Sequence, residues 1–203
     1  MSYDTIASDE IIEKTQIALE ANGMKVTIAQ DRAAATAAVL DLLPKGAEVL
    51  TSTSKTLEAL ELTKIIDESG DYDAVRPKLN AMWGDPTKKR EQRKLGAAPD
   101  YVLGSVHAIT QDGVVFIVSN TGSQLPSYSY GAGNVIWVVG AQKLVTDLED
   151  AKKRLDEYIF PLENERAKQA YGSGTQVSKI LTVHKEVAPG RITIIIVKEA
   201  LGF

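Results

Sequence analysis

The sequence contains no cysteine among its 203 residues. This absence excludes disulfide bonds, thiolate catalysis and cysteine-ligated zinc or iron–sulfur clusters on the chain. Histidine is also scarce, because only His107 and His184 are present, and they fall in different expected elements. With neither a His-x-x-x-His spacing nor a His–Glu pair, these side chains do not indicate a metal site, and we expect none.

The sequence also lacks an excess of basic charge and any long apolar run. Its net charge of −4 argues against nucleic acid or an anionic membrane surface as a partner. The basic run at residues 88–94 includes Glu91 and is expected to be a solvated helix face, with steering of an anionic ligand left open. No apolar run spans a bilayer, and residues 1–10 do not resemble a signal peptide. We therefore expect a cytoplasmic protein without a membrane span.

Several well-known catalytic and cofactor motifs are missing as well. There is no G-x-G-x-x-G dinucleotide loop, no P-loop and no Gly-x-Ser-x-Gly elbow, and no Ser/His/Asp triad is apparent. The sequence therefore leaves the cofactor unknown.

What is present indicates an α/β fold. Apolar spacing predicts a helix at residues 8–22, a strand at 24–29, a helix at 31–43, a strand at 47–50 and a helix at 55–67. This alternation predicts a three-layer α/β sandwich, in which helices cover both faces of a mainly parallel central sheet.

The remaining two thirds continue in the same style. We expect irregular structure at residues 72–85, a helix at 87–95 and three strands within residues 101–143, at the centre of the sheet. A helix is expected to run to about residue 160, with Pro161 starting another that ends near residue 171. Strands are expected at 179–183 and 191–197. Because strands are expected near both ends, we expect one domain over residues 1–203.

A stretch of four hydroxyl residues is the first candidate site, and we call residues 51–54 the hydroxyl loop. It stands at the carboxyl end of an expected parallel strand and at the start of an expected helix, where α/β folds bind anionic ligands. One hydroxyl would suffice to cap the helix. Helix capping and ligand binding are therefore both kept for this loop.

Two polar turns in residues 101–143 are further candidates. Residues 110–113 read as a hairpin turn, and residues 121–124 either approach a ligand or turn the chain. We expect both turns to form pocket rims facing the hydroxyl loop. His107 lies among apolar residues and is expected to be a hydrogen-bonded core or pocket-wall histidine, with a role as general base kept open. Lys143 and Arg191 could meet an anion, although surface or structural roles are favoured.

Several short motifs in combination resemble the lactate-utilisation (LUD) domain family. They are GSVHAIT-x-DG at 104–113, TGSQL at 121–125, VIWVVG at 135–140, PLE at 161–163 and PGRIT at 189–193. The resemblance implies a NagB/RpiA/CoA transferase-like fold and a link to bacterial L-lactate oxidation beside iron–sulfur oxidoreductase subunits. In that superfamily the loop at an early helix start binds phosphate, which implies such a role for Thr53 and Ser54.

The sequence departs from the family in two respects. Many members carry Glu-Asp-Gly where this chain has Gln111, Asp112 and Gly113, so a glutamyl-thioester mechanism at position 111 is not available. Some members carry a cysteine cluster before the last strand, and residues 171–186 contain none. No iron–sulfur or zinc role is therefore transferred to this chain.

These observations lead to one main hypothesis and two alternatives. The main hypothesis is a site for a small anionic metabolite, a carboxylate or phosphate, in L-lactate oxidation or related metabolism. The alternatives are a non-catalytic accessory subunit of an iron–sulfur lactate-oxidising complex and a sugar-phosphate isomerase or transferase relative. Enzymatic activity and a homo-oligomeric state are left open. The candidate catalytic residues are Asp112 and His107, and the candidate ligand-binding residues are Thr51, Ser52, Thr53, Ser54, Thr110, Gln111, Thr121, Gly122, Ser123 and Gln124.

Overall fold

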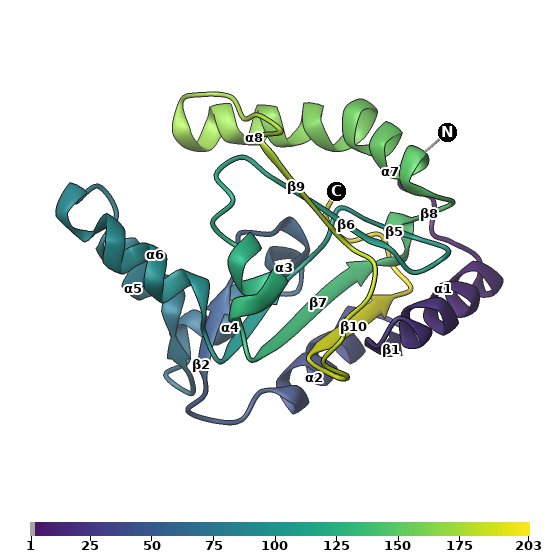
Figure 1. The fold of residues 1–203 in the computed structure, drawn as a ribbon, viewed down its shortest axis with the longest axis horizontal. Coiled ribbons are helices and arrows are strands. Elements are labelled where there is room, and N and C mark those ends of the chain that lie inside the picture. Colours follow the sequence, from purple (N-terminus) through teal and green to yellow (C-terminus); the bar gives the residue numbers. More distant parts are fainter. Residues whose placement is uncertain (1–2) are drawn as a thin grey trace.

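A computed structural model describes residues 3–203 and contains a main sheet of six parallel strands (Figure 1). Its strands are, in spatial order, β1 (Lys25–Ala29), β10 (Ile192–Val197), β7 (Asn134–Gly140), β4 (Tyr101–Gly104), β2 (Glu48–Thr51) and β3 (Asp73–Ala74). Every neighbouring pair in this sheet is parallel. The prediction of an α/β fold with a mainly parallel central sheet is confirmed.

Strands β10 and β7, which are neighbours inside the main sheet, contribute buried residues to both sides of the core. All six residues of β10 are buried, and Ile194 of β10 pairs in register with Trp137 of β7. Successive side chains of a strand point to opposite faces, so an almost wholly apolar strand serves two apolar layers. Ile194 and Trp137 pack in one cluster, whereas Ile195 and Ile136 pack in the other.

Helices cover both faces of the main sheet. Helices α1 (Asp9–Ala21) and α5 (Val75–Ala81) supply buried residues to the first cluster, while α2 (Arg32–Leu42), α3 (Lys55–Ala59) and α4 (Leu62–Glu68) supply the second. The predicted helix caps are confirmed, since Ser8 accepts a hydrogen bond from Ile11 N at 3.4 Å and Asp31 accepts one from Ala34 N at 2.8 Å.

The predicted helix at residues 55–67 is in fact two helices, α3 and α4. Between them Glu61 has a positive φ of 55°, which breaks the helix. Leu60 and Leu62 flank this residue and are both buried, although positions two apart face different sides of a continuous helix. The break therefore lets both leucines pack into the core.

The segment predicted to be irregular is partly regular. It forms β3 and α5, followed by a 3-10 turn (Pro86–Lys88) and α6 (Lys89–Ala97). Pro77 is tolerated because it stands in the first turn of α5, where backbone N–H groups have no helical acceptor.

A second sheet of four strands lies beside the main one. Its spatial order is β8 (Leu144–Val145), β5 (Ala108–Thr110), β6 (Val115–Ser119) and β9 (Lys179–Val183). The prediction of three strands at the centre of one sheet for residues 101–143 is therefore wrong. β4 and β7 belong to the main sheet, but β5 and β6 form an antiparallel hairpin in the second sheet.

A long helical segment covers the outer face of the second sheet. It runs without interruption through α7 (Leu148–Arg154), a π-helical turn (Leu155–Ile159) and α8 (Phe160–Tyr171). Figure 1 shows this segment along one side of the molecule, with the second sheet between it and the main sheet. The predicted restart at Pro161 is confirmed, since α8 begins at Phe160, carries Pro161 in its first turn and ends at Tyr171. The structure adds that a π turn, and not a loop, joins it to the preceding helix. Among residues 3–203, no helix has both the length and the apolar character to cross a bilayer.

Candidate functional site

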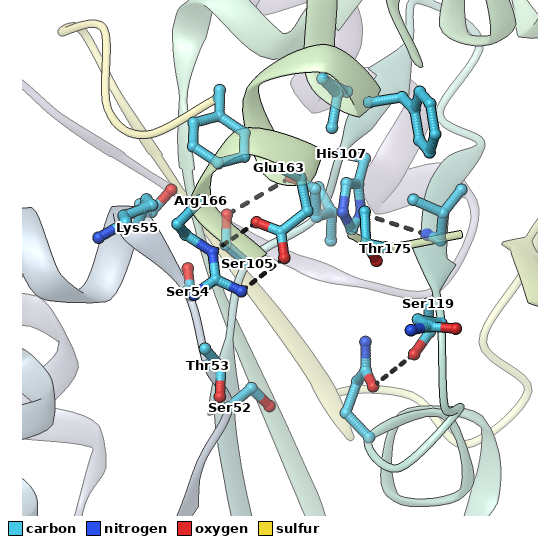
Figure 2. Close-up of a pocket in the computed structure, with 18 of the residues that line it drawn as sticks. Ser52, Thr53, Ser54, Lys55, Ser105, His107, Ser119, Glu163, Arg166 and Thr175 are labelled. Carbon is cyan, nitrogen blue, oxygen red and sulfur yellow. Dashed lines mark hydrogen bonds and ion pairs between the residues drawn. The ribbon is translucent and has the colours of Figure 1, made fainter. Parts of the chain in front are cut away.

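A cavity of about 230 Å³ lies at the carboxyl ends of three neighbouring main-sheet strands. The hydroxyl loop follows β2, residues 105–107 follow β4, and Lys143 follows β7. The opposite wall comes from the end of β6, the π turn, α8 and residues 175–177. In Figure 2, Ser52, Thr53 and Ser54 lie along one side of the cavity, with His107 and Ser119 on another. This edge of a parallel sheet is where α/β folds bind ligands.

Lys143 is the most deeply buried cation of the cavity wall, with only 2% of its surface exposed. Its Nζ is bonded to Thr56 Oγ1 at 2.9 Å, Ser105 Oγ at 3.2 Å and the Val106 carbonyl oxygen at 3.3 Å. Burial, reinforced by the positive charge of Arg154, lowers the pKa of Lys143 to about 7. The amine can therefore carry or release its proton near neutral pH.

His107 lies on the cavity wall at the start of the β5–β6 hairpin. Its Nδ1 accepts a hydrogen bond from the backbone N–H of Val118 at 3.2 Å. Burial, followed by the charges of Lys143 and Arg154, lowers the pKa of His107 to about 3. The imidazole is neutral at ordinary pH, with its proton on Nε2 because Nδ1 is an acceptor. His107 can therefore offer its Nε2–H as a hydrogen-bond donor, and its low pKa makes it a weak base.

Tyr128 closes the cavity beneath the hydroxyl loop. Its hydroxyl donates a hydrogen bond to Ser52 Oγ at 2.9 Å, and its ring meets Trp137 edge-on at 5.3 Å. Burial raises the pKa of Tyr128 to about 12, so the phenol stays protonated. Gly104 lets the Tyr128 hydroxyl pack against β4, because a Cβ at position 104 would stand 1.8 Å from the phenol oxygen.

The charges that line the cavity are unequal. Among residues 3–203 its lining carries four cations, Lys55, Arg76, Lys143 and Arg166, against two carboxylates, Glu58 and Glu163. Both carboxylates already form ion pairs, Glu58 with Lys55 and Glu163 with Arg166. Within the described chain, neither Arg76 nor Lys143 has a carboxylate within ion-pair distance. Within the described chain the cavity therefore holds one fixed cation without a carboxylate partner, Arg76, and one amine, Lys143, that can be charged or neutral near pH 7.

Arg76 reaches the cavity from α5, next to the hydroxyl loop. Its Nε donates a hydrogen bond to the Thr51 carbonyl oxygen at 2.9 Å, and its Nη2 donates to the same oxygen. Burial lowers the pKa of Arg76, an effect that Asp67 partly opposes. An arginine remains charged under such conditions, so this guanidinium is a fixed cation at the loop.

Comparison with known proteins places the chain in a family. A family model described as the LUD domain matches residues 12–197. The chain belongs to the LUD-domain family. The resemblance noted from the sequence motifs is thus confirmed.

One solved structure is similar to this LUD domain over nearly its whole length. It is the crystal structure, at 1.70 Å resolution, of a DUF162 family protein from Deinococcus radiodurans. The TM-score is 0.54 at 16% sequence identity, and the match covers 95% of this chain and 99% of that chain. At this identity the likeness supports the fold alone. No curated protein is significantly similar to the chain.

The hydroxyl loop of the LUD domain serves several purposes. Ser54 caps α3, accepting a hydrogen bond from Leu57 N at 3.4 Å, so the capping interpretation is confirmed for this residue. Thr51 is buried and donates to the Asp67 carboxylate at 3.1 Å. Ser52, Thr53 and Ser54 line the cavity, whereas Thr51 does not.

The 110–113 turn lies outside the cavity, so its interpretation as a pocket rim is wrong. Thr110 and Asp112 hydrogen-bond to each other, and Gln111 accepts a hydrogen bond from Lys14 of α1 at 3.0 Å. The backbone oxygens of Asp112 and Gly113 accept from Asn22 at 3.2 Å. The hairpin explains this placement, since its open end carries His107 and Ser119 to the cavity and its closed end carries the turn to α1.

The 121–124 loop reaches the cavity in part. Ser123 and Gln124 line it, whereas Thr121 and Gly122 are not in its wall. Ser119 holds the loop, accepting a hydrogen bond from Gly122 N at 2.9 Å and donating one to Gln124 Oε1 at 3.0 Å. Thr121 Oγ1 accepts from Ser123 N at 3.3 Å. The non-lining residues therefore shape the loop that presents the other two.

Sequence reasoning missed several polar residues of the cavity, including Arg76, Ser105 and Tyr128, and undervalued Lys143. Arg76 stands in a segment predicted to be irregular, and Ser105 and Tyr128 were not singled out. Lys143 was favoured for a surface or structural role but is buried in the cavity wall. A polar residue just after a buried strand, as Ser105 is, was the available signal. Arg191 is structural, since it pairs with Glu186 at 2.7 Å and donates to the Tyr128 carbonyl at 2.8 Å.

No group of three or more His, Asp or Glu side chains in residues 3–203 is arranged to hold a metal ion. The polar groups of the cavity are instead hydroxyls, amides, one neutral imidazole and more basic groups than carboxylates. Such a set suits an anionic organic ligand with hydrogen-bond acceptors.

Proposed function

We propose that this LUD domain binds a small anionic metabolite, a carboxylate or a phosphate, in the cavity between its two sheets. The observation that carries the proposal is Arg76, a fixed cation without a carboxylate partner in the described chain, while both cavity carboxylates are paired. Lys143 adds a second positive charge whenever it is protonated. A buried cation without a counter-ion is costly, and a bound anion would offset that cost.

The arrangement of donors supports the same conclusion. Arg76 stands beside the hydroxyl loop, where Ser52 and Thr53 offer hydroxyl groups. His107 offers a neutral Nε2–H from the opposite wall. A volume of about 230 Å³ suits a compact metabolite rather than a large cofactor. We propose L-lactate oxidation or related metabolism as the setting, with L-lactate among the first ligands to test.

Thermal unfolding with a panel of anions tests this proposal. The panel contains L-lactate, sugar phosphates, coenzyme A and nucleotides at millimolar concentration, each with its counter-ion as a blank. A ligand of the cavity should raise Tm by about 5–10 °C at roughly 100 times its Kd. If no anion in the panel raises Tm, the proposed function is wrong.

Two variants of α5 locate the binding site. Arg76→Gln removes the cation at the hydroxyl loop, so the anion-dependent rise in Tm should largely disappear. Lys78→Gln is the matched control, because Lys78 lies on the same helix, pairs with Asp73 and does not line the cavity. It removes the same charge and should keep the full rise. Equal losses in both variants would indicate non-specific charge effects.

A further inference from the structure

We propose that Ser105 and Lys143 form a nucleophile–base pair for acyl transfer, acting on small esters whose acid part carries an anionic group. The pair itself stands on the geometry of the two residues. The requirement for an anionic group in the substrate rests on the proposed function, because Arg76 and the hydroxyl loop would bind that group.

The hydrogen bonds around Lys143 indicate which neighbour shares a proton with it. Thr56 is buried and donates its own hydroxyl proton to the Leu201 carbonyl at 3.1 Å, so towards Lys143 it accepts. The Val106 carbonyl oxygen accepts as well. A neutral amine has two N–H donors and one lone pair. As an ammonium, Lys143 donates to Ser105 Oγ at 3.2 Å, and the Ser105 hydroxyl donates to the Val106 carbonyl oxygen at 3.5 Å. In the neutral amine the two acceptors use both N–H donors, so the lone pair is left to accept the hydroxyl proton of Ser105.

The surroundings favour the neutral amine. Lys143 is almost fully buried, and Arg154 of α7, which has no exposed surface, adds a positive charge nearby. The imidazole of His107, the other titratable group near Lys143, is neutral and adds no charge. With a pKa of about 7, Lys143 can accept a proton from Ser105 at neutral pH and return it.

The exposure of the two residues also fits their proposed roles, because the nucleophile is more accessible to a substrate than the base. Ser105 is only partly buried and lines the cavity, while Lys143 lies at the cavity base with 2% of its surface exposed. The nucleophile thus faces the ligand and the base stands behind it. Ser52 and His107 line the same cavity from different sides, and the Ser52 hydroxyl and the His107 Nε2–H are the donors available to a developing oxyanion.

The proposed reaction consumes only the ester and water. Ser105 Oγ forms a bond to the acyl carbon while its proton moves to Lys143 Nζ. The bond between that carbon and the alcohol oxygen then breaks, and the alcohol leaves with the proton from Nζ. Water attacks the acyl-serine, giving a proton to Nζ, and the acid is released as Ser105 Oγ takes that proton back.

Covalent labelling with diisopropyl fluorophosphate tests the pair, read out by intact mass and peptide mapping. We expect a single phosphorylated residue, Ser105, and no adduct in Ser105→Ala. Lys143→Met should slow labelling by at least about 100-fold, because it removes the base. Ser129→Ala is the matched control, since Ser129 is exposed and does not line the cavity, and it should label at the wild-type rate.

If Lys143→Met does not fold, the pH dependence of the labelling rate of the wild type tests the role of Lys143 instead. The labelling rate should rise about tenfold between about pH 6 and pH 8 as Lys143 loses its proton. A flat profile, no adduct on Ser105, or unchanged labelling of a folded Lys143→Met would overturn the pair. If anions stabilise the protein but Ser105 is not labelled, only the pair is wrong. If Ser105 is labelled but no anion binds, the anion site and the substrate class are wrong.

Discussion

Lys143 is held by three neutral oxygen atoms and faces no carboxylate in the described part of the chain. Its ammonium form is therefore solvated by fixed dipoles alone, while Arg154 repels it. The Arg154 guanidinium is itself fully buried, without a hydrogen-bond acceptor in residues 3–203, and stacks over Tyr158 at 5.0 Å. The buried guanidinium of Arg154 therefore destabilises the nearby ammonium form of Lys143, and together with burial this lowers the pKa of the lysine.

The low pKa of Lys143 predicts a specific pH dependence of stability. A lysine in the unfolded chain titrates near 10.5, whereas Lys143 in the folded protein has a pKa of about 7. Between these values the unfolded state binds more protons, so the contribution of Lys143 to stability is lowest below about pH 7 and rises towards 10.5. Relative to Lys143→Met, the wild-type free energy of unfolding should rise by up to about 1.4 kcal/mol per pH unit in this window.

Urea denaturation at about pH 7.5 and pH 9.5, at constant ionic strength, measures this difference. Lys78→Met removes an exposed lysine and should follow the wild type at both values. Equal changes with pH in the wild type and Lys143→Met would contradict a buried, weakly solvated ammonium.

At the scale of residues, the sequence predicted some of the residues that line the cavity but not its charged residues. The hydroxyl loop and His107 stand at strand ends that a chain-order argument can identify, and Ser52, Thr53, Ser54 and His107 do line the cavity. Burial of Lys143 depends on Thr56, Ser105 and Val106, which come from distant parts of the sequence. Local sequence patterns do not show that these residues come together around Lys143 in the fold.

Among the elements, the β5–β6 hairpin decides which motif residues reach the cavity. Antiparallel pairing of Ala108 with Phe116 sets His107 beside Val118, and it sends the 110–113 turn to α1. The strand pattern predicted the hairpin but not the sheet that it joins. Strands β5 and β6 of the second sheet are almost continuously buried, as are β4 and β7 of the main sheet, so the division into two sheets could not be predicted from local sequence.

The junction of β4 with the cavity yields a second stability prediction. A Cβ at position 104 would lie 1.8 Å from the Tyr128 hydroxyl oxygen and 2.8 Å from its ring carbon. Gly104→Ala must therefore displace Tyr128 and weaken its hydrogen bond to Ser52. We expect the free energy of unfolding to fall by about 1–3 kcal/mol, measured by urea denaturation.

Gly96→Ala is the matched control for this change. Gly96 lies in α6, and a Cβ there would meet Leu79 at an ordinary 3.7 Å. Because alanine favours a helix over glycine, this variant should gain about 0.5–1 kcal/mol. A Gly104→Ala protein as stable as the wild type would show that Tyr128 is not packed tightly under β4.

At the scale of the whole molecule, the cavity differs in charge from the protein around it. The chain has a net charge of −4, yet the cavity lining has four basic and two acidic side chains, and Lys143 is the basic one that can lose its proton near pH 7. Its walls come from both sheets and from the long helical segment, as Figures 1 and 2 show together. The alternation of helices and strands predicted the main sheet. Only the folded structure shows that α8 and residues 175–177 form part of the cavity wall.

Isothermal titration calorimetry tests most directly whether this cavity binds an anion. The ligand is the anion with the largest thermal stabilisation, titrated into the wild type, Arg76→Gln and Lys78→Gln. We predict one site per chain in the wild type, an affinity at least about tenfold weaker in Arg76→Gln, and an unchanged affinity in Lys78→Gln. An Arg76→Gln protein that binds the anion as tightly as the wild type would contradict the account.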